Sequence, residues 1–224
     1  MKQKVIVISA HPDDETLGVG GTLLKHKAQG DEIYWLILTE ISTDQGYVSN
    51  QIKMREKEIE QVAQLFGFIK TFQLKYRTAT LSHLNVPEMI QKITQIFQEI
   101  QPEIIYTPNR SDAHSDHRVL FDAVIACTKS FRHPYIKQVL MYECISETEF
   151  APALPEKVFI PNYFVDISPY LEQKTTIMKV FNSELGEHPF PRSIENIKAL
   201  AHFRGAIAGV YYAEAFQLLK YLLK

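Results

Sequence analysis

The chain has few cysteines, no surplus of positive charge and no long apolar run, and each shortage excludes a class of protein. Its 224 residues include two cysteines, Cys127 and Cys144, which form no CxxC pair, so we expect buried thiols and no disulfide framework. The 24 Lys and Arg residues face 26 Asp and Glu residues, which leaves little charge to neutralise the phosphates of a nucleic acid. No segment approaches the roughly 20 apolar residues of a membrane span.

The first residues do not have the pattern of a secretory leader. Their apolar run is short, and acidic residues follow it at once. Hydrophobic residues make up 46% of the chain and charged residues 22%, which is typical of a globular protein that buries a core. We therefore expect a cytoplasmic protein with one domain, residues 1–224, in which residues 147–224 form a C-terminal elaboration that lines the pocket.

What the sequence does contain is a regular alternation of short apolar runs with longer helical patterns. The predicted strands are residues 4–9, 32–39, 68–74, 103–107 and 138–143, and the predicted helices between them are residues 18–30, 50–67, 86–100 and 117–129. This alternation is typical of an α/β fold with a Rossmann-like, mostly parallel sheet and helices on both faces. A C-terminal cap should follow, with an edge strand within 157–166 and two helices near 169–185 and 193–223.

Polar residues gather directly after the first predicted strand. The stretch AHPDDE, residues 10–15, places a histidine, two aspartates and a glutamate in five consecutive positions. A strand end with so many carboxylates is costly unless a positive charge lies among them. His11 and Asp14 are three residues apart and can converge on one cation, while Asp13 points toward whatever the cation holds. Pro12 stiffens this loop.

A second polar cluster follows the fourth predicted strand. His114 and His117 are one helical turn apart, and Asp116 can orient one of them through its second ring nitrogen. Ligands of open α/β sheets bind at the carboxyl ends of the strands, so the two clusters can meet at one edge of the sheet. One or two of these imidazoles, with His11 and Asp14, make a ligand set that suits a catalytic zinc ion and that ferrous iron would also accept.

Three other interpretations weigh less. Acidic pairs after a first strand also bind magnesium in receiver-type domains, but such domains are much shorter and do not need the histidines. The glycines at 18, 20 and 21 form no GxGxxG loop, so we expect them to serve close packing of helix and strand. A non-catalytic metal or sugar-nucleotide binder on the same scaffold would have no need of Asp13, which is placed to act as the base for a water held by the metal.

The two motifs together resemble a known family. AHPDDE and the HSDH stretch at 114–117 are similar to the paired motifs of the LmbE-like, or PIG-L, family of zinc-dependent de-N-acetylases. The stretch MREKEIEQVAQLFG, residues 54–67, is similar to the second helix of that family. HPFPRS at 188–193 and RGAIAGVYYAEAF at 204–216 resemble its bacterial branch of small sugar deacetylases.

The resemblance implies an enzyme that hydrolyses the acetamide of an N-acetylated amino sugar, such as an N-acetylglucosamine conjugate, and releases acetate and a free amine. The implied setting is the biosynthesis of surface polysaccharide or lipopolysaccharide, or of a thiol of the bacillithiol type. Asp112 stands where the mycothiol branch carries an aromatic residue, which argues against a mycothiol-type substrate. A small N-acetyl sugar is the expected partner, and a homo-oligomer is implied because family members often form one.

The resemblance also implies roles for single residues. The ligands of zinc, or of another divalent metal such as iron, would be His11, Asp14 and His117. The reaction would depend on Asp13 as the general base, on His114 at the oxyanion and on Asp116 behind the histidines. Arg55 would contact the sugar or its attached group. From the C-terminal cap, His188 and Arg192 are placed to reach over the pocket.

Overall fold

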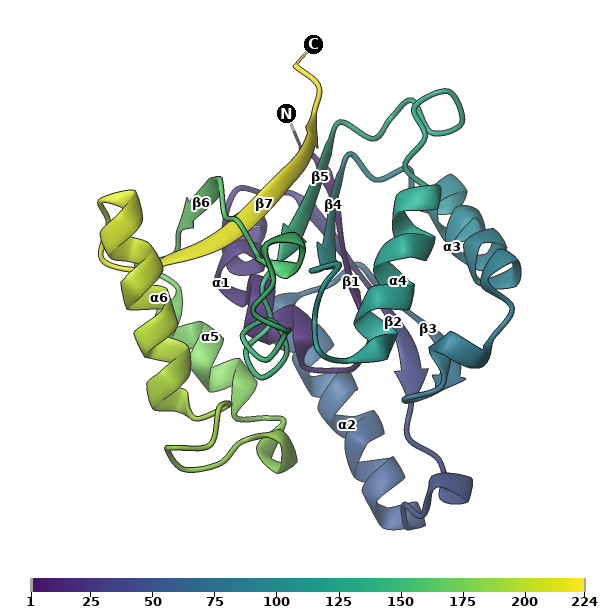
Figure 1. Cartoon of the computed structure of the whole chain (residues 1–224), viewed down its shortest axis with the longest axis horizontal. Helices are drawn as coiled ribbons and strands as arrows, with labels where there is room; N and C mark the ends of the chain where they lie inside the picture. Colours follow the sequence, from purple (N-terminus) through teal and green to yellow (C-terminus); the bar gives the residue numbers. More distant parts are fainter. Residues whose placement is uncertain (1, 224) are drawn as a thin grey trace.

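A seven-stranded sheet forms the centre of the computed structural model, which describes residues 2–223 (Figure 1). The strands are β1 (Lys4–Ser9), β2 (Glu32–Glu40), β3 (Lys70–Arg77), β4 (Ile104–Pro108), β5 (Gln138–Tyr142), β6 (Tyr163–Asp166) and β7 (Ala213–Tyr221). Their order across the sheet is β3-β2-β1-β4-β5-β7-β6. The first five strands run parallel, and β7 is antiparallel to both of its neighbours. The predicted α/β fold with a mostly parallel sheet is confirmed.

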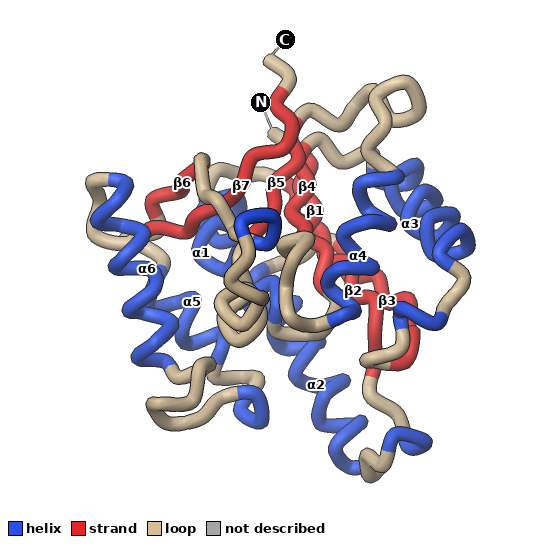
Figure 2. Tube along the Cα trace, in the orientation of Figure 1, coloured by secondary structure: helices blue, strands red, loops and turns tan. Residues whose placement is uncertain are grey.

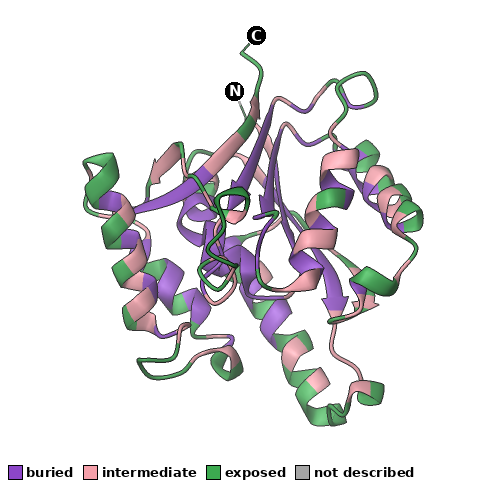
Figure 3. Ribbon diagram, viewed as in Figure 1, coloured by how far each residue is buried: buried purple, intermediate pink, exposed green. Residues whose placement is uncertain are grey.

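Helices cover both faces of this sheet. They are α1 (Asp14–Ala28), α2 (Ser49–Phe66), α3 (Val86–Ile100), α4 (Ser115–Ala126), α5 (Leu171–Met178) and α6 (Ile194–Ala208). Side chains alternate across β1, so Val5 and Val7 join the core beneath α1, α2, α5 and α6, whereas Ile6 and Ile8 join the core beneath α3 and α4. Figure 3 shows the resulting buried layer of strands between helices whose outer faces are exposed. Among the described residues, no helix combines the length and the apolar character that crossing a membrane requires.

The predicted elements agree with the structure in type and order, although not in every boundary, except toward the C-terminus. The helix predicted for residues 193–223 was wrong: α6 ends at Ala208, and β7 follows it (Figure 2). Gly209 adopts a left-handed conformation with φ 74° and ends the helix. The apolar pattern after it suits either element, and the strand forms because β5 and β6 both pair with it. The predicted edge strand within 157–166 is confirmed as β6.

The first helix begins earlier than predicted and lies unusually close to the sheet. It starts at Asp14, because acidic residues in a first turn interact favourably with the helix dipole. A Cβ atom on Gly18 would lie 2.2 Å from the ring of Tyr142, and one on Gly21 would lie 2.6 Å from Ile167. The close packing expected of these glycines is therefore confirmed.

A buried ion pair fastens the same helix to the C-terminal elements. The amine of Lys174 in α5 lies 2.7 Å from the carboxylate of Glu214 in β7, and it also donates to the carbonyl of Leu17 at 2.7 Å. The Glu214 carboxylate accepts hydrogen bonds from the backbone N–H groups of Gly21 and Thr22, both at 2.8 Å. Because both charged groups are almost fully buried, removing one of them would leave the other as an uncompensated charge in the interior.

Candidate active site

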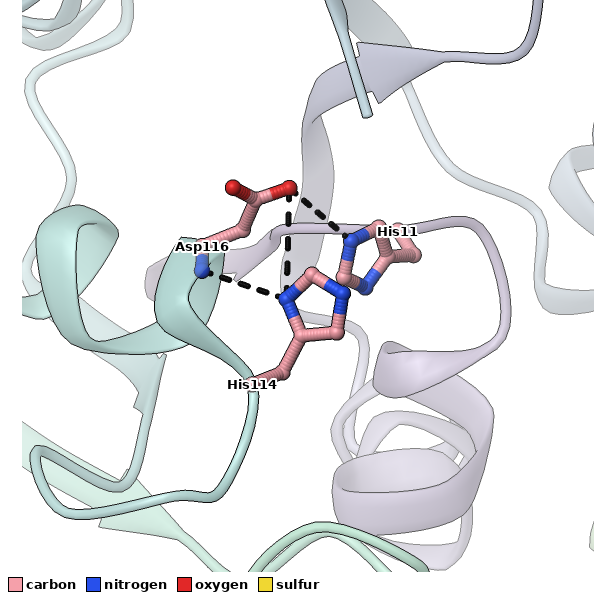
Figure 4. A group of neighbouring side chains, drawn as sticks. All are labelled: His11, His114 and Asp116. Atoms are coloured by element: carbon pink, nitrogen blue, oxygen red, sulfur yellow. Dashed lines mark hydrogen bonds and ion pairs between the residues drawn. The ribbon is translucent and has the colours of Figure 1, made fainter. Parts of the chain in front are cut away.

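The two polar clusters meet at the carboxyl ends of β1 and β4, which are adjacent in the sheet. The loop after β1 carries His11 and leads into α1, and the loop after β4 leads into α4. Figure 4 shows His11 facing His114 and Asp116 from the start of α4. The ring centroids of His11 and His114 are 4.4 Å apart. Two segments separated by about one hundred residues of chain thus form one site, as expected for ligands at the edge of an α/β sheet.

Three of these side chains are arranged to hold a metal ion. Ligand atoms of His11, Asp14 and His117 all lie within 4.8 Å of one another. The Nε2 atom of His117 is fully buried and lies 3.3 Å from Oδ1 of Asp14, yet it makes no hydrogen bond with any described residue. A polar atom in the interior without a hydrogen bond is costly, and a cation held by both His117 and Asp14 would satisfy it. The residues present therefore fit a divalent metal.

A second group, His11 with His114 and Asp116, is equally compact but is already satisfied. The Asp116 carboxylate accepts hydrogen bonds from the backbone N–H groups of Ala79 at 2.7 Å and Leu81 at 3.0 Å. Nδ1 of His114 accepts from the N–H of Asp116 at 3.1 Å. In the first group, the Nε2 atom of His117 lacks a hydrogen bond, so this group is the better candidate for the metal ligands.

The charges of the first group stabilise one another. Burial acts to raise the pKa of Asp14, but the neighbouring His117 and His11 outweigh it and lower that pKa. Burial acts to lower the pKa of His117, but Asp14 and Asp112 outweigh it and raise that pKa well above its usual range. In the metal-free chain, the pair therefore favours a protonated imidazole beside a carboxylate. A bound cation would take the place of that proton.

The carboxylate behind His117 is Asp112, which the sequence interpretation did not select. Its Oδ2 atom lies 2.9 Å from Nδ1 of His117, and its Oδ1 atom accepts from Asn109 at 2.9 Å and from Thr148 at 2.7 Å. Asp116, which was predicted to sit behind the histidines, faces His11, at 3.3 Å from Nε2. The available signal was the position of Asp112 in the same polar stretch, five residues before His117.

His114 is set up as a neutral hydrogen-bond donor. It is the N-cap of α4, and because its Nδ1 accepts from a backbone N–H, the proton of a neutral ring is on Nε2. Burial lowers the pKa of His114 to about 4, and His11 acts in the same direction. The ring therefore offers an N–H without a positive charge near neutral pH.

Asp13 lies at the turn between β1 and α1 in a strained conformation. Its φ of 129° is rare for any residue with a side chain, and such strain is concentrated at functional sites. The buried carboxylate of Glu15 accepts the backbone N–H of Asp13 at 3.1 Å and so braces the turn. Burial raises the pKa of Asp13 well above its usual value, and Asp14 and Glu184 add to the shift, while Arg192 opposes it.

A cavity of about 210 Å³ opens beside these residues, and two of the three predicted substrate-binding residues line it. Arg55 donates to the carbonyl of Pro12 at 3.1 Å, which ties α2 to the loop that carries Asp13. Arg192 reaches the cavity from the segment between α5 and α6. His188 is exposed and is not among the residues that line the cavity.

The comparisons with known proteins agree with this geometry. The model of the PIG-L family, described as GlcNAc-PI de-N-acetylase, matches residues 6–128, more than half of the chain. The chain therefore belongs to the PIG-L family, and the family predicted from its two motifs is confirmed. The matched segment contains all three candidate metal ligands.

Individual relatives are similar over most of their length. Diacetylchitobiose deacetylase of Thermococcus kodakarensis is 25% identical over 224 residues, which cover 97% of this chain and 83% of that protein. The structure of N,N'-diacetylchitobiose deacetylase from Pyrococcus horikoshii is also 25% identical, with a TM-score of 0.76 over 97% of this chain and 84% of that one. A conserved protein of Thermus thermophilus is 25% identical, with a TM-score of 0.79 over 99% and 97% of the two chains.

Proposed function

We propose that this chain is a metal-dependent N-deacetylase that hydrolyses the acetamide of an N-acetylated amino sugar, or of its conjugate, to acetate and a free amine. The observation that carries the proposal is the buried Nε2 of His117, which makes no hydrogen bond and faces Asp14 at 3.3 Å, with Asp13 on the wall of the adjoining cavity. Two relatives named as diacetylchitobiose deacetylases support an N-acetyl sugar as the substrate.

His11, Asp14 and His117 would hold the metal. Two imidazoles and a carboxylate suit zinc or ferrous iron best among the common ions. When bound, such an ion polarises a carbonyl oxygen and makes water easier to deprotonate. Asp112 fixes the ring of His117 through Nδ1, so that Nε2 would be available to the metal. The protein's own residues then carry the proton and stabilise the developing charge.

Asp13 takes the proton of the attacking water and passes it to the leaving nitrogen. Burial raises the pKa of Asp13 in the metal-free chain, and a carboxylate with a higher proton affinity is a stronger base. His114 donates its Nε2 hydrogen to the substrate oxygen as negative charge builds there. Arg55 keeps the Asp13 loop in place through the carbonyl of Pro12. Neither a serine nor a cysteine nucleophile is needed.

The test is acetate release from a panel of N-acetyl sugars and conjugates by metal-free protein, by protein restored with zinc or ferrous iron, and by Asp13→Asn protein. We expect activity that returns with metal and is lost in Asp13→Asn. Stoichiometric metal binding without acetate release from any compound would favour the alternative of a non-catalytic metal or sugar-nucleotide binder. Absence of metal binding would reject the assignment of His11, Asp14 and His117.

A further inference from the structure

The cavity wall carries a strong excess of negative charge. Its lining includes six carboxylates and two guanidiniums, with no lysine; the carboxylates belong to Asp13, Asp14, Glu40, Glu56, Glu147 and Glu184. A divalent cation would reduce the formal excess from four negative charges to two. One of the six, Glu40, is also paired with Lys75 at 3.3 Å, so with the cation bound the formal excess is one negative charge.

One carboxylate, that of Glu184, forms ion pairs with the guanidinium groups of both arginines. It forms an ion pair with Arg55, and its Oε2 atom lies 3.2 Å from Arg192. Its backbone carbonyl also accepts from Nε of Arg192 at 2.9 Å. Glu184 thus links α2 to the segment before α6 at the wall of the cavity.

The remaining donors of the two arginines are largely engaged as well. Arg55 donates to Ser183 at 3.1 Å, and its Nε lies 3.1 Å from Glu58, a second carboxylate behind the cavity wall. Arg192 donates to the hydroxyl of Ser146 at 2.9 Å. A phosphate or carboxylate is bound tightly by an arginine that offers two parallel N–H groups, and at both arginines the pair made by Nε and Nη2 is already engaged.

We propose that Glu184 makes this site selective for N-acetyl sugars whose attached group is neutral or cationic, and that the site discriminates against conjugates with a phosphate, nucleotide diphosphate or carboxylate. The inference rests on the proposed deacetylase function and narrows its substrate class. Like charges brought together in a cavity cost binding energy, so an anionic attached group would be repelled by the lining and would find no free guanidinium.

The experiment compares kcat/KM, by acetate release, for a neutral and two anionic substrates that share the same N-acetyl sugar. The neutral one is N,N'-diacetylchitobiose, and the anionic ones are N-acetylglucosamine 1-phosphate and N-acetylglucosaminyl malate. The proteins are metal-loaded wild type, Glu184→Gln and Glu56→Gln. Both variants remove one negative charge from the cavity lining, but only Glu184→Gln removes the carboxylate that is paired with both arginines. Thermal unfolding of each variant checks that the fold is kept.

We expect wild type to prefer the neutral substrate at least about tenfold. Glu184→Gln should reduce this preference at least about fivefold, chiefly through a lower KM for the anionic substrates, and Glu56→Gln should change it much less. A wild-type preference for an anionic substrate, or an equal effect of both variants, would overturn the role of Glu184 while the deacetylase function stands. Failure of every metal-loaded protein to release acetate from all three compounds would instead count against the proposed function itself. If Glu184→Gln unfolds, Glu184→Asp, which keeps the charge, must retain the wild-type preference.

Discussion

Replacing Asp13 with glycine should stabilise the metal-free protein and should remove most of the activity of the metal-loaded protein. The φ of 129° at this position costs about 1–3 kcal/mol for a residue with a side chain, and glycine removes that cost. The freedom that glycine gains in the unfolded chain offsets about 0.5–1 kcal/mol of it. Glycine also removes a buried carboxylate that lies near those of Asp14, Glu15 and Glu184.

The net effect should be a gain of roughly 1–2 kcal/mol, which for a chain of this size raises Tm by about 2–8 °C. Asp13→Asn is the matched variant, because it removes the charge but keeps the side chain and its strain. We therefore expect a stability order of Gly above Asn above Asp, measured by thermal unfolding in the presence of a chelator. Both variants should lose about 10²- to 10⁴-fold in kcat of the metal-loaded protein, which is the usual contribution of a general base.

The pH dependence supplies a further check. A carboxyl group whose pKa is raised by folding destabilises the fold when it is ionised. This penalty is absent below the pKa of the unfolded chain and is complete above the pKa of the folded protein. The advantage of Asp13→Asn over wild type should therefore grow as pH rises between those two values. If both variants are less stable than wild type at neutral pH, the carboxylate of Asp13 has a structural role and our reasoning is refuted.

Three further predictions concern the surroundings of the site. Asp112→Asn should weaken metal binding by about 10–100-fold in competition with a chelator, because it disturbs the partner of His117; unchanged affinity would contradict this. His114→Phe should lower kcat by about 10²- to 10³-fold with little change in KM, and a purely KM effect would argue against a role at the oxyanion. Lys174→Met should cost about 3–5 kcal/mol in urea unfolding, because it leaves Glu214 charged and unpaired in the interior; an unchanged midpoint would show that the pair is not needed.

The sequence was informative wherever one local pattern decided the structure. The buried run before His11 and the strong periodicity of residues 86–100 each suit only one element, and the structure contains both. The paired motifs could also be placed together in advance, because parallel strands bring their carboxyl ends to a common edge.

The parts that were missed depend on contacts between distant segments. Residues 213–221 pair with β5 and β6, and no local pattern announces that pairing. Glu184 is an ordinary acidic residue in sequence, and its importance arises only where α2 and the segment before α6 converge on it. Asp112 lies close to His117 in sequence and could have been proposed as its partner. Whether Asp112 or Asp116 contacts His117 depends, however, on the direction in which the first turn of α4 faces.

The hydrogen bonds between α1 and Glu214 in β7 also have a consequence for the order in which the site forms during synthesis. All three candidate metal ligands lie within residues 11–117. Glu214, which holds the backbone of α1 through Gly21 and Thr22, lies about one hundred residues further along the chain and is therefore synthesised after all of them. The helix that presents Asp14 thus gains this support only once β7 has been made and has paired with the sheet.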